Sequence, residues 1–126
     1  MKNNKFDGLL ELISQDALYV DNSLIQTIGL YRAVIITELM SYRDKAKQQG
    51  IIDDDGYFLY TSQKLQKSIN IGRTKAENAI KFFKKAKIIN TTVKGMPAST
   101  YLKINHNAGE LLNELINKKN YGREEI

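Results

Sequence analysis

The chain has 126 residues, of which 42% are hydrophobic and 26% are charged, with a formal net charge of +5 and no cysteine. This length suits one domain with a single core, and the lack of cysteine excludes disulfides and thiolate metal sites. No apolar run approaches the roughly 18 residues that span a bilayer, and the N-terminus lacks a signal-peptide pattern. We therefore expect a cytoplasmic protein with no membrane partner.

Positive charge is concentrated in the middle of the chain. Residues 56–103 contain ten Lys or Arg and a single acid, Glu77, whereas residues 1–55 carry six basic and nine acidic groups and residues 104–126 carry three and four. Solvated surfaces usually mix both signs, so a block of one sign favours a polyanionic partner. The alternative is a basic surface that only promotes solubility.

The first third of the chain is predicted to be helical. A short amphipathic helix is expected over residues 5–18, and one or two turns over residues 24–28 after a capping segment at residues 21–23. Gly29 is expected at a bend. Residues 30–48 show a strong helical pattern that is apolar more than halfway round at residues 33–36, which predicts a helix that packs on two sides.

The elements expected next follow in chain order and are identified by turn residues, caps and periodicity. They are a turn at residues 53–56, a strand at 57–60, a helix at 63–69 capped by Thr61 or Ser62, a turn at 70–72, a helix at 73–87, strands at 88–94 and 100–105 joined by a tip at 95–99, and an amphipathic helix at 108–118 followed by a polar tail.

This order of elements is that of a winged helix-turn-helix, with residues 73–87 as the recognition helix and residues 88–105 as the wing. We therefore expect an α+β fold made of an N-terminal helical extension at residues 1–29, the winged helix-turn-helix domain at 30–106, and a C-terminal amphipathic helix and polar tail at 107–126. Apolar residues stand where the second and third helices of such a unit must meet, at Leu65, Ile69, Ile71, Ala76, Ile80 and Phe83.

The predicted recognition helix separates two kinds of side chain when it is drawn at about 100° per residue. The apolar side gathers Ala76, Ala79, Ile80, Phe83 and Ala86, with Lys87 at its edge. The opposite side gathers Thr74, Asn78, Lys81 and Lys85, and Arg73 and Lys75 lie near the start of the helix. Asn can pair with adenine, Thr can contact a thymine methyl group or a phosphate, and Lys or Arg can neutralise phosphates or read guanine. One side is thus expected to face the core and the other to contact DNA.

Two neighbouring features leave alternatives open. Phe82 falls outside the apolar side, and packing against the wing or the central helix is favoured over base contact. In the wing, the basic Lys94, the flexible Gly95, the apolar Met96 and Ser99 can follow a phosphate backbone or enter a minor groove. The same stretch is also compatible with an ordinary loop.

A family resemblance rests on three motifs: the Gly-aromatic-aromatic start of the strand at residues 56–58, the Thr-Ser helix start at 61–62, and the KG-x-P-A wing at 94–98 followed by Tyr-x-x-Ile-Asn. Residues 28–105 resemble the winged-helix domains of replication proteins from Gram-positive phages and plasmids, namely phage replisome organisers and plasmid initiators, and more distantly MarR-like regulators. The resemblance implies a double-stranded DNA partner and contact with replication or transfer proteins of the same element. Such proteins usually continue into a second domain, so an accessory factor that binds a transfer origin is a further reading.

Catalysis is not expected. His106 is the single histidine, and no GxSxG or Walker motif is present. An EF-hand frame over Asp53, Asp55 and Gly56 would place Ile51 and Ser62 where calcium ligands are required, so no metal or cofactor is expected. The two functional hypotheses are a sequence-specific DNA-binding factor for replication or conjugative transfer of a plasmid or phage, and a transcriptional repressor with the same fold.

The oligomeric state is also left open between two hypotheses. The wide apolar surface of residues 30–40 and the stripe Leu111, Leu112, Leu115 and Ile116 offer more apolar face than one small sheet covers, which predicts a homodimer. In the alternative, the last helix packs on the central helix within a monomer.

Overall fold

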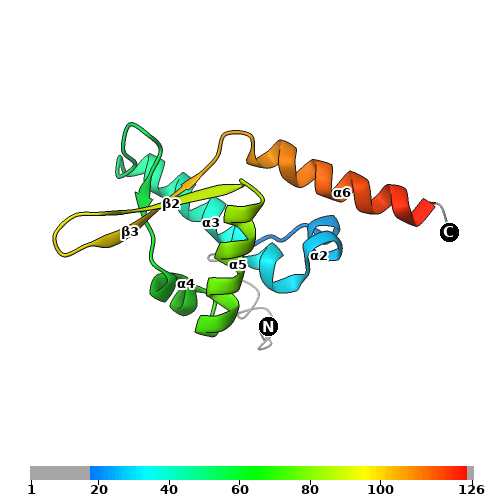
Figure 1. The fold of residues 1–126 in the computed structure, drawn as a ribbon, viewed down its shortest axis with the longest axis horizontal. Coiled ribbons are helices and arrows are strands. Elements are labelled where there is room, and N and C mark those ends of the chain that lie inside the picture. The colour runs from blue at the N-terminus through cyan, green and yellow to red at the C-terminus, as the bar shows by residue number, and fades with distance from the viewer. Residues whose placement is uncertain (1–17, 125–126) are drawn as a thin grey trace, which may run out of the picture.

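The computed structural model describes residues 18–124 and has an α+β winged-helix fold, as the sequence predicts. The elements in chain order (Figure 1) are α2 (Asn22–Ile28), α3 (Leu30–Gln48), β1 (Phe58–Leu59), α4 (Ser62–Ser68), α5 (Arg73–Lys85), β2 (Ile89–Lys94), β3 (Ser99–Ile104) and α6 (Ala108–Glu124). The amphipathic helix predicted over residues 5–18 lies outside the described residues, apart from Leu18.

The long helix α3 is the central element of the core. Its Ala33, Ile35, Ile36 and Leu39 are fully buried, and α2, α5 and β3 all pack against it. The bend before it is confirmed at Gly29, whose φ of 91° is in the left-handed region that glycine tolerates best. This packing confirms that α3 is buried on more than one side.

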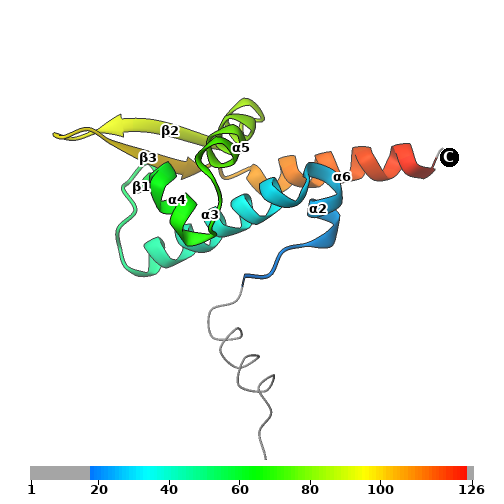
Figure 2. The same cartoon turned by 90° about the horizontal axis from the view of Figure 1, so that it is seen from below.

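The sheet places a hairpin beside the recognition helix. Its strand order is β1-β3-β2 and both pairs are antiparallel, with Phe58 opposite Leu102 and Thr91 opposite the same Leu102. Figure 2 shows the β2–β3 hairpin and α5 together on one side of α3. The hairpin continues past the core as the wing.

The helix-turn-helix contacts predicted from the sequence are present. Leu65 of α4 and Ala76 and Phe83 of α5 are fully buried. The other predicted residues are partly buried and pack against the same core: Ile69, Ile71 and Ile80. Thr61 is the N-cap of α4, and its hydroxyl accepts a hydrogen bond from the Lys64 backbone N–H. Apolar spacing and capping therefore account for how α4 and α5 are held together.

The recognition helix ends two residues earlier than predicted. Helix α5 stops at Lys85, Ala86 is its C-cap, and Lys87 has a φ of 64°. The Ile88 N–H donates to the Phe83 carbonyl at 2.9 Å and the Lys87 N–H to the Lys84 carbonyl at 3.1 Å, the pattern of a Schellman motif. The prediction that Lys87 extends the apolar side of this helix is therefore wrong, because the chain turns toward β2 before that residue.

The last helix is longer than predicted, since α6 continues to Glu124 where a polar tail was expected after residue 118. It packs along α2, with Ala108 and Leu112 buried in the core and Leu111, Leu115 and Ile116 partly buried. Within the chain, α6 therefore packs chiefly on α2, which in turn packs on the central helix α3. No helix in residues 18–124 has the length and apolar content to cross a membrane.

Candidate nucleic-acid interface

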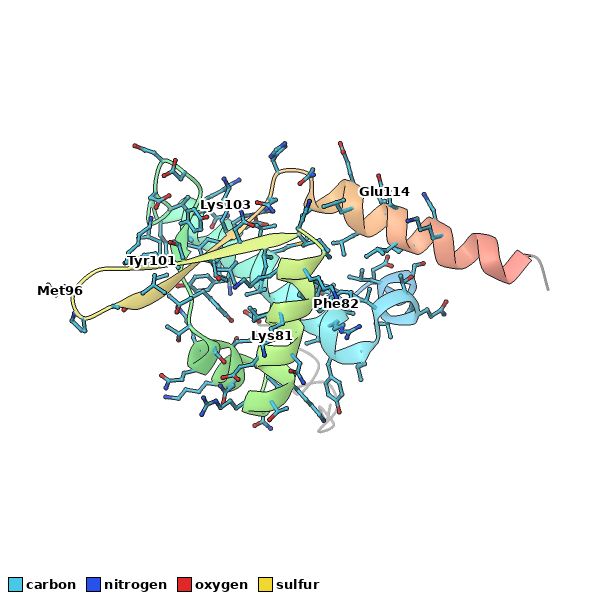
Figure 3. The ribbon with its side chains drawn as sticks, viewed as in Figure 1. Lys81, Phe82, Met96, Tyr101, Lys103 and Glu114 are labelled. Carbon is cyan, nitrogen blue, oxygen red and sulfur yellow. The ribbon has the colours of Figure 1, made fainter. Side chains whose placement is uncertain are left out.

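The exposed side of α5 carries the side chains that the sequence assigns to DNA. Thr74, Asn78, Lys81 and Lys85 are all exposed, while Ala76, Ala79 and Phe83 on the other side are buried. Figure 3 shows Lys81 and Phe82 projecting from different sides of this helix. The face opposite the core is therefore open to solvent along the length of the helix.

Phe82 packs against the central helix. The Arg32 guanidinium of α3 lies 3.9 Å from the centroid of its ring, and the ring meets Phe83 edge-on at 5.2 Å. A cation over an aromatic face is an attractive contact that holds both side chains in place. Phe82 thus has a structural role between α5 and α3.

The cationic residues of α5 fall into two groups. The side chains of Lys81, Lys84 and Lys85 are exposed and make no ion pair or hydrogen bond in the described part of the chain. Arg73 and Lys75 do have partners: Arg73 Nε lies 2.8 Å from Glu77 Oε1, and Lys75 Nζ donates to the Tyr31 hydroxyl and lies 3.9 Å from that ring. The hydrogen bond that Arg73 donates to the Glu77 carboxylate raises the pKa of Arg73 further, so this guanidinium stays charged. Lys81, Lys84 and Lys85 are the cations for which a phosphate would replace only water.

A cleft of about 230 Å³ separates α5 from the hairpin. Its floor is apolar and includes Leu65, Ile80 and Leu102, while the ammonium-bearing side chains of Lys81 and Lys84 line one wall. The remaining polar lining comes from Thr61, Ser62, Glu77, Thr91 and Thr100. An anionic strand passing between helix and wing would meet two unpaired cations and several hydroxyl donors there.

The tip of the wing is the most exposed part of the hairpin. Met96 is fully exposed at the end of the loop, as Figure 3 shows, and Gly95 has a φ of 90°. Ser99 lines a second groove together with Arg73 at the start of α5 and Gln63 of α4. Of the predicted wing residues, Met96 is therefore the most exposed, and Ser99 borders the groove that Arg73 and Gln63 also line.

Lys94 has a different environment from the other predicted residues. It shares one face of β2 with Thr92, whereas Thr91 on the other face lines the cleft beside α5. The Lys94 ammonium pairs with Asp53 at 2.5 Å and lies 5.0 Å from the Tyr57 ring and 5.2 Å from the Tyr101 ring. The structure thus separates Lys94 from the side chains of α5.

Sequence reasoning missed several residues at this surface. Lys84 is not among the residues predicted to contact DNA, but it lines the cleft, and so do Thr91 and Thr100 of the hairpin. Ile89 and Thr91 are two residues apart and share one face of β2, so a strand pattern with apolar Ile89 facing the core could have placed Thr91 on the helix side. The pairing of Tyr31 with Lys75 joins residues 44 positions apart, and no local pattern predicts it.

The described residues contain no group of three or more His, Cys, Asp or Glu side chains that could hold a metal ion. Asp53 of the predicted turn instead binds backbone groups: its Oδ1 accepts the N–H groups of Asp55 and Tyr57, each at 2.9 Å. This carboxylate organises the loop that leads into β1.

Neither a protein-family model nor a curated protein matches the sequence. A solved structure described as the N-terminal domain of a DNA-binding protein is similar, with a TM-score of 0.60 at 15% identity over 82% of this chain and 84% of that one. A Rep–DNA complex matches with a TM-score of 0.59 at 12% identity over 83% of each chain. The adhesin competence repressor AdcR of Streptococcus pyogenes gives a TM-score of 0.44 at 18% identity, over 95% of this chain and 74% of that chain. The first two similarities establish the fold that the chain shares with them.

Proposed function

We propose that the protein binds double-stranded DNA, with α5 in the major groove and the β2–β3 hairpin against the neighbouring backbone or minor groove. The observation that supports this most directly is the exposed face of α5, where Lys81 and Lys85 have no partner within the described chain and lie beside Thr74 and Asn78. The net charge of the segment from residue 56 to 103 supports the same partner.

The proposed contacts divide into two chemical classes. Arg73, Lys75, Lys81 and Lys85 neutralise phosphates, and Lys84 adds a cation in the cleft beside the hairpin. We assign base recognition to the uncharged residues, with Asn78 making the main base contact. These residues are Thr74 and Asn78 on the helix and Gly95, Met96 and Ser99 in the wing. A carboxamide that pairs with adenine discriminates between bases, whereas a lysine on a phosphate binds all sequences alike.

Asn78→Ala tests this division. We expect a loss of about 1–3 kcal/mol on the specific site, because a bidentate base contact disappears, and an unchanged salt dependence, because no charge is removed. The measurement is fluorescence anisotropy with a labelled duplex of the specific site and a shuffled duplex of equal length. Equal binding of the wild-type protein to both duplexes would contradict sequence-specific recognition, and salt-insensitive binding would contradict DNA binding through phosphates.

The biological role that we propose is origin binding on a plasmid or phage, as an initiator or accessory factor in replication or conjugative transfer. It rests on the motif resemblance at residues 56–62 and 94–105, and the Rep–DNA complex is one of the proteins with a similar fold. The partners in this role would be replication or transfer proteins of the same element. The second candidate is a transcriptional repressor with the same DNA contacts. Footprinting on the protein's own replicon separates the two, since protection of an origin supports the first role and protection of a promoter alone supports the second.

A homodimer is a separate proposal. Leu111, Leu115 and Ile116 of α6 are only partly buried, so this side of the helix keeps apolar area in contact with water. Covering it with a second copy would also pair two recognition helices for repeated or palindromic half-sites. The measurement is light scattering at micromolar concentration. A single species at 14.4 kDa would contradict the homodimer and show that no second copy covers the apolar side of α6.

A further inference from the structure

Lys94 is tied to the opposite edge of the sheet. It is the last residue of β2, and β2 and β1 are the two edge strands in the order β1-β3-β2. Its ammonium reaches Asp53, which precedes β1 and is 41 residues away in sequence. The same ammonium lies 5.2 Å from the ring centroid of Tyr101 on the middle strand and 5.0 Å from that of Tyr57. A single side chain therefore links the end of β2 to the middle strand and to the segment that leads into β1.

Asp53 is itself fixed in place. One carboxylate oxygen accepts the backbone N–H groups of Asp55 and Tyr57, each at 2.9 Å, and the other meets Lys94. The Asp53 backbone N–H also donates to the Tyr57 carbonyl at 2.9 Å. A carboxylate held at three points is a defined anchor, in contrast to the freely rotating partner of most surface ion pairs.

The two charges respond to each other. The hydrogen bond from Lys94 and those from Tyr57 and Asp55 hold the pKa of the Asp53 carboxyl below its ordinary value of 3.8. Asp53 in turn raises the pKa of Lys94. Both side chains keep their charges at neutral pH.

We infer that Lys94 is a positioning residue, whose bridge to Asp53 sets the angle of the β2–β3 hairpin, and that it is not a phosphate ligand. β1 pairs with β3 only at Phe58 and Leu59, so the ladder on that side stops at Tyr101, short of the tip. The bridge from Lys94 ties the outer end of β2 to the turn that precedes β1, beyond the last β1–β3 pair. This inference rests on the proposed DNA-binding function, and it replaces the sequence-based assignment of Lys94 to phosphate contact.

The two assignments predict opposite effects at Asp53. If Lys94 positions the wing, Asp53→Asn and Lys94→Met remove the same bridge and weaken DNA binding by a similar factor. Roughly 2- to 30-fold is expected for residues that act through others. If Lys94 binds a phosphate, Asp53→Asn frees the cation and removes a negative charge, and binding becomes tighter.

The experiment measures affinity against salt concentration for the full chain on the replicon duplex that footprinting protects. We expect both single variants to keep the wild-type log–log slope and the double variant to be no weaker than either single one, because one interaction is lost in all three. Lys103→Met is the matched control, since it removes a cation from the same face of the hairpin, 5.8 Å from the Tyr57 ring, without breaking the pair.

Three outcomes overturn the inference. The first is a slope flattened by about 0.9 in Lys94→Met, as loss of one phosphate contact requires. The second is tighter or unchanged binding in Asp53→Asn. The third is an equal loss of affinity in Lys103→Met, which would assign the effect to net charge.

A readout without DNA keeps this inference separate from the proposed function. In an NMR titration the Asp53 carboxyl should have a midpoint below 3.8, and Lys94→Met should move that midpoint upward. If the chain binds no DNA, the proposed function fails while this titration still reports the ion pair. If the Asp53 midpoint is the same in both proteins, the bridge is absent and the inference fails even where DNA binds.

Discussion

Replacing Lys81 by alanine is the most direct test of the α5 surface. The side chain is exposed and makes no ion pair or hydrogen bond within the described residues, so the substitution removes a cation without breaking an internal contact. Each neutralised phosphate contributes about 0.9 to the slope of log affinity against log salt. Between about 50 and 200 mM salt, a slope change of that size alters the affinity ratio of variant to wild type by about 3.5-fold. The variant should therefore be most impaired at low salt.

The assay is fluorescence anisotropy of a labelled duplex at several salt concentrations, with random-sequence DNA in parallel because a phosphate contact serves all sequences. Lys47→Ala is the matched control, because it removes the same charge from the last turn of α3, and Figure 2 shows that end of α3 lying away from α5. Equal slopes for wild type and Lys81→Ala would refute the assignment of Lys81 to a phosphate. A slope flattened equally by Lys47→Ala would refute a localised interface.

Further predictions concern the core, a helix cap and the wing. Phe83→Ala should lower the free energy of unfolding by about 3–5 kcal/mol, because the ring is fully buried. Phe82→Ala should lower it by less, because that ring is only partly buried. An unchanged melting temperature for Phe83→Ala would contradict this core. Asp21→Ala should cost about 1 kcal/mol in a chemical denaturation curve, because Asp21 Oδ1 accepts the Leu24 N–H at 3.0 Å as the N-cap of α2. Met96→Ala should relax sequence preference less than Asn78→Ala in a binding-site selection, and the reverse order would assign specificity to the wing.

The winged-helix core could be predicted because its determinants are local. The spacing of Ala76, Ala79 and Phe83 in α5 follows helical periodicity, and Thr61 and Gly29 act through their immediate neighbours. Residues that repeat at a fixed interval must share a face, so their burial follows once the helices pair. The exposed side of α5 could be predicted for the same reason.

Contacts between distant segments could not be predicted in this way. The bridge from Lys94 to Asp53 and the pairing of Lys75 with Tyr31 depend on how the hairpin and α3 are packed, which no spacing in the sequence encodes. The end of α5 was misplaced because helical periodicity continues through Ala86 to Lys87, while a left-handed lysine, a conformation more common for glycine or asparagine, ends the helix. The polar residues after position 118 predict a tail outside the helix, but α6 continues through them to Glu124.

The junction between α5 and the hairpin has a mechanical consequence. The Asn105 side chain donates to the Lys87 carbonyl at 2.6 Å, and its backbone N–H donates to the Ile88 carbonyl at 2.9 Å, so the segment leaving α5 is clamped to the end of β3. These two hydrogen bonds hold the base of the hairpin at the end of α5, whereas the bridge from Lys94 to Asp53 acts on its outer end. On a duplex bound as proposed, the base of the hairpin would keep its distance from the end of α5, so a mismatch in groove width there would be met by deformation of the DNA. Duplex sequences that bend or narrow easily at that span would then be favoured at base pairs that no side chain touches.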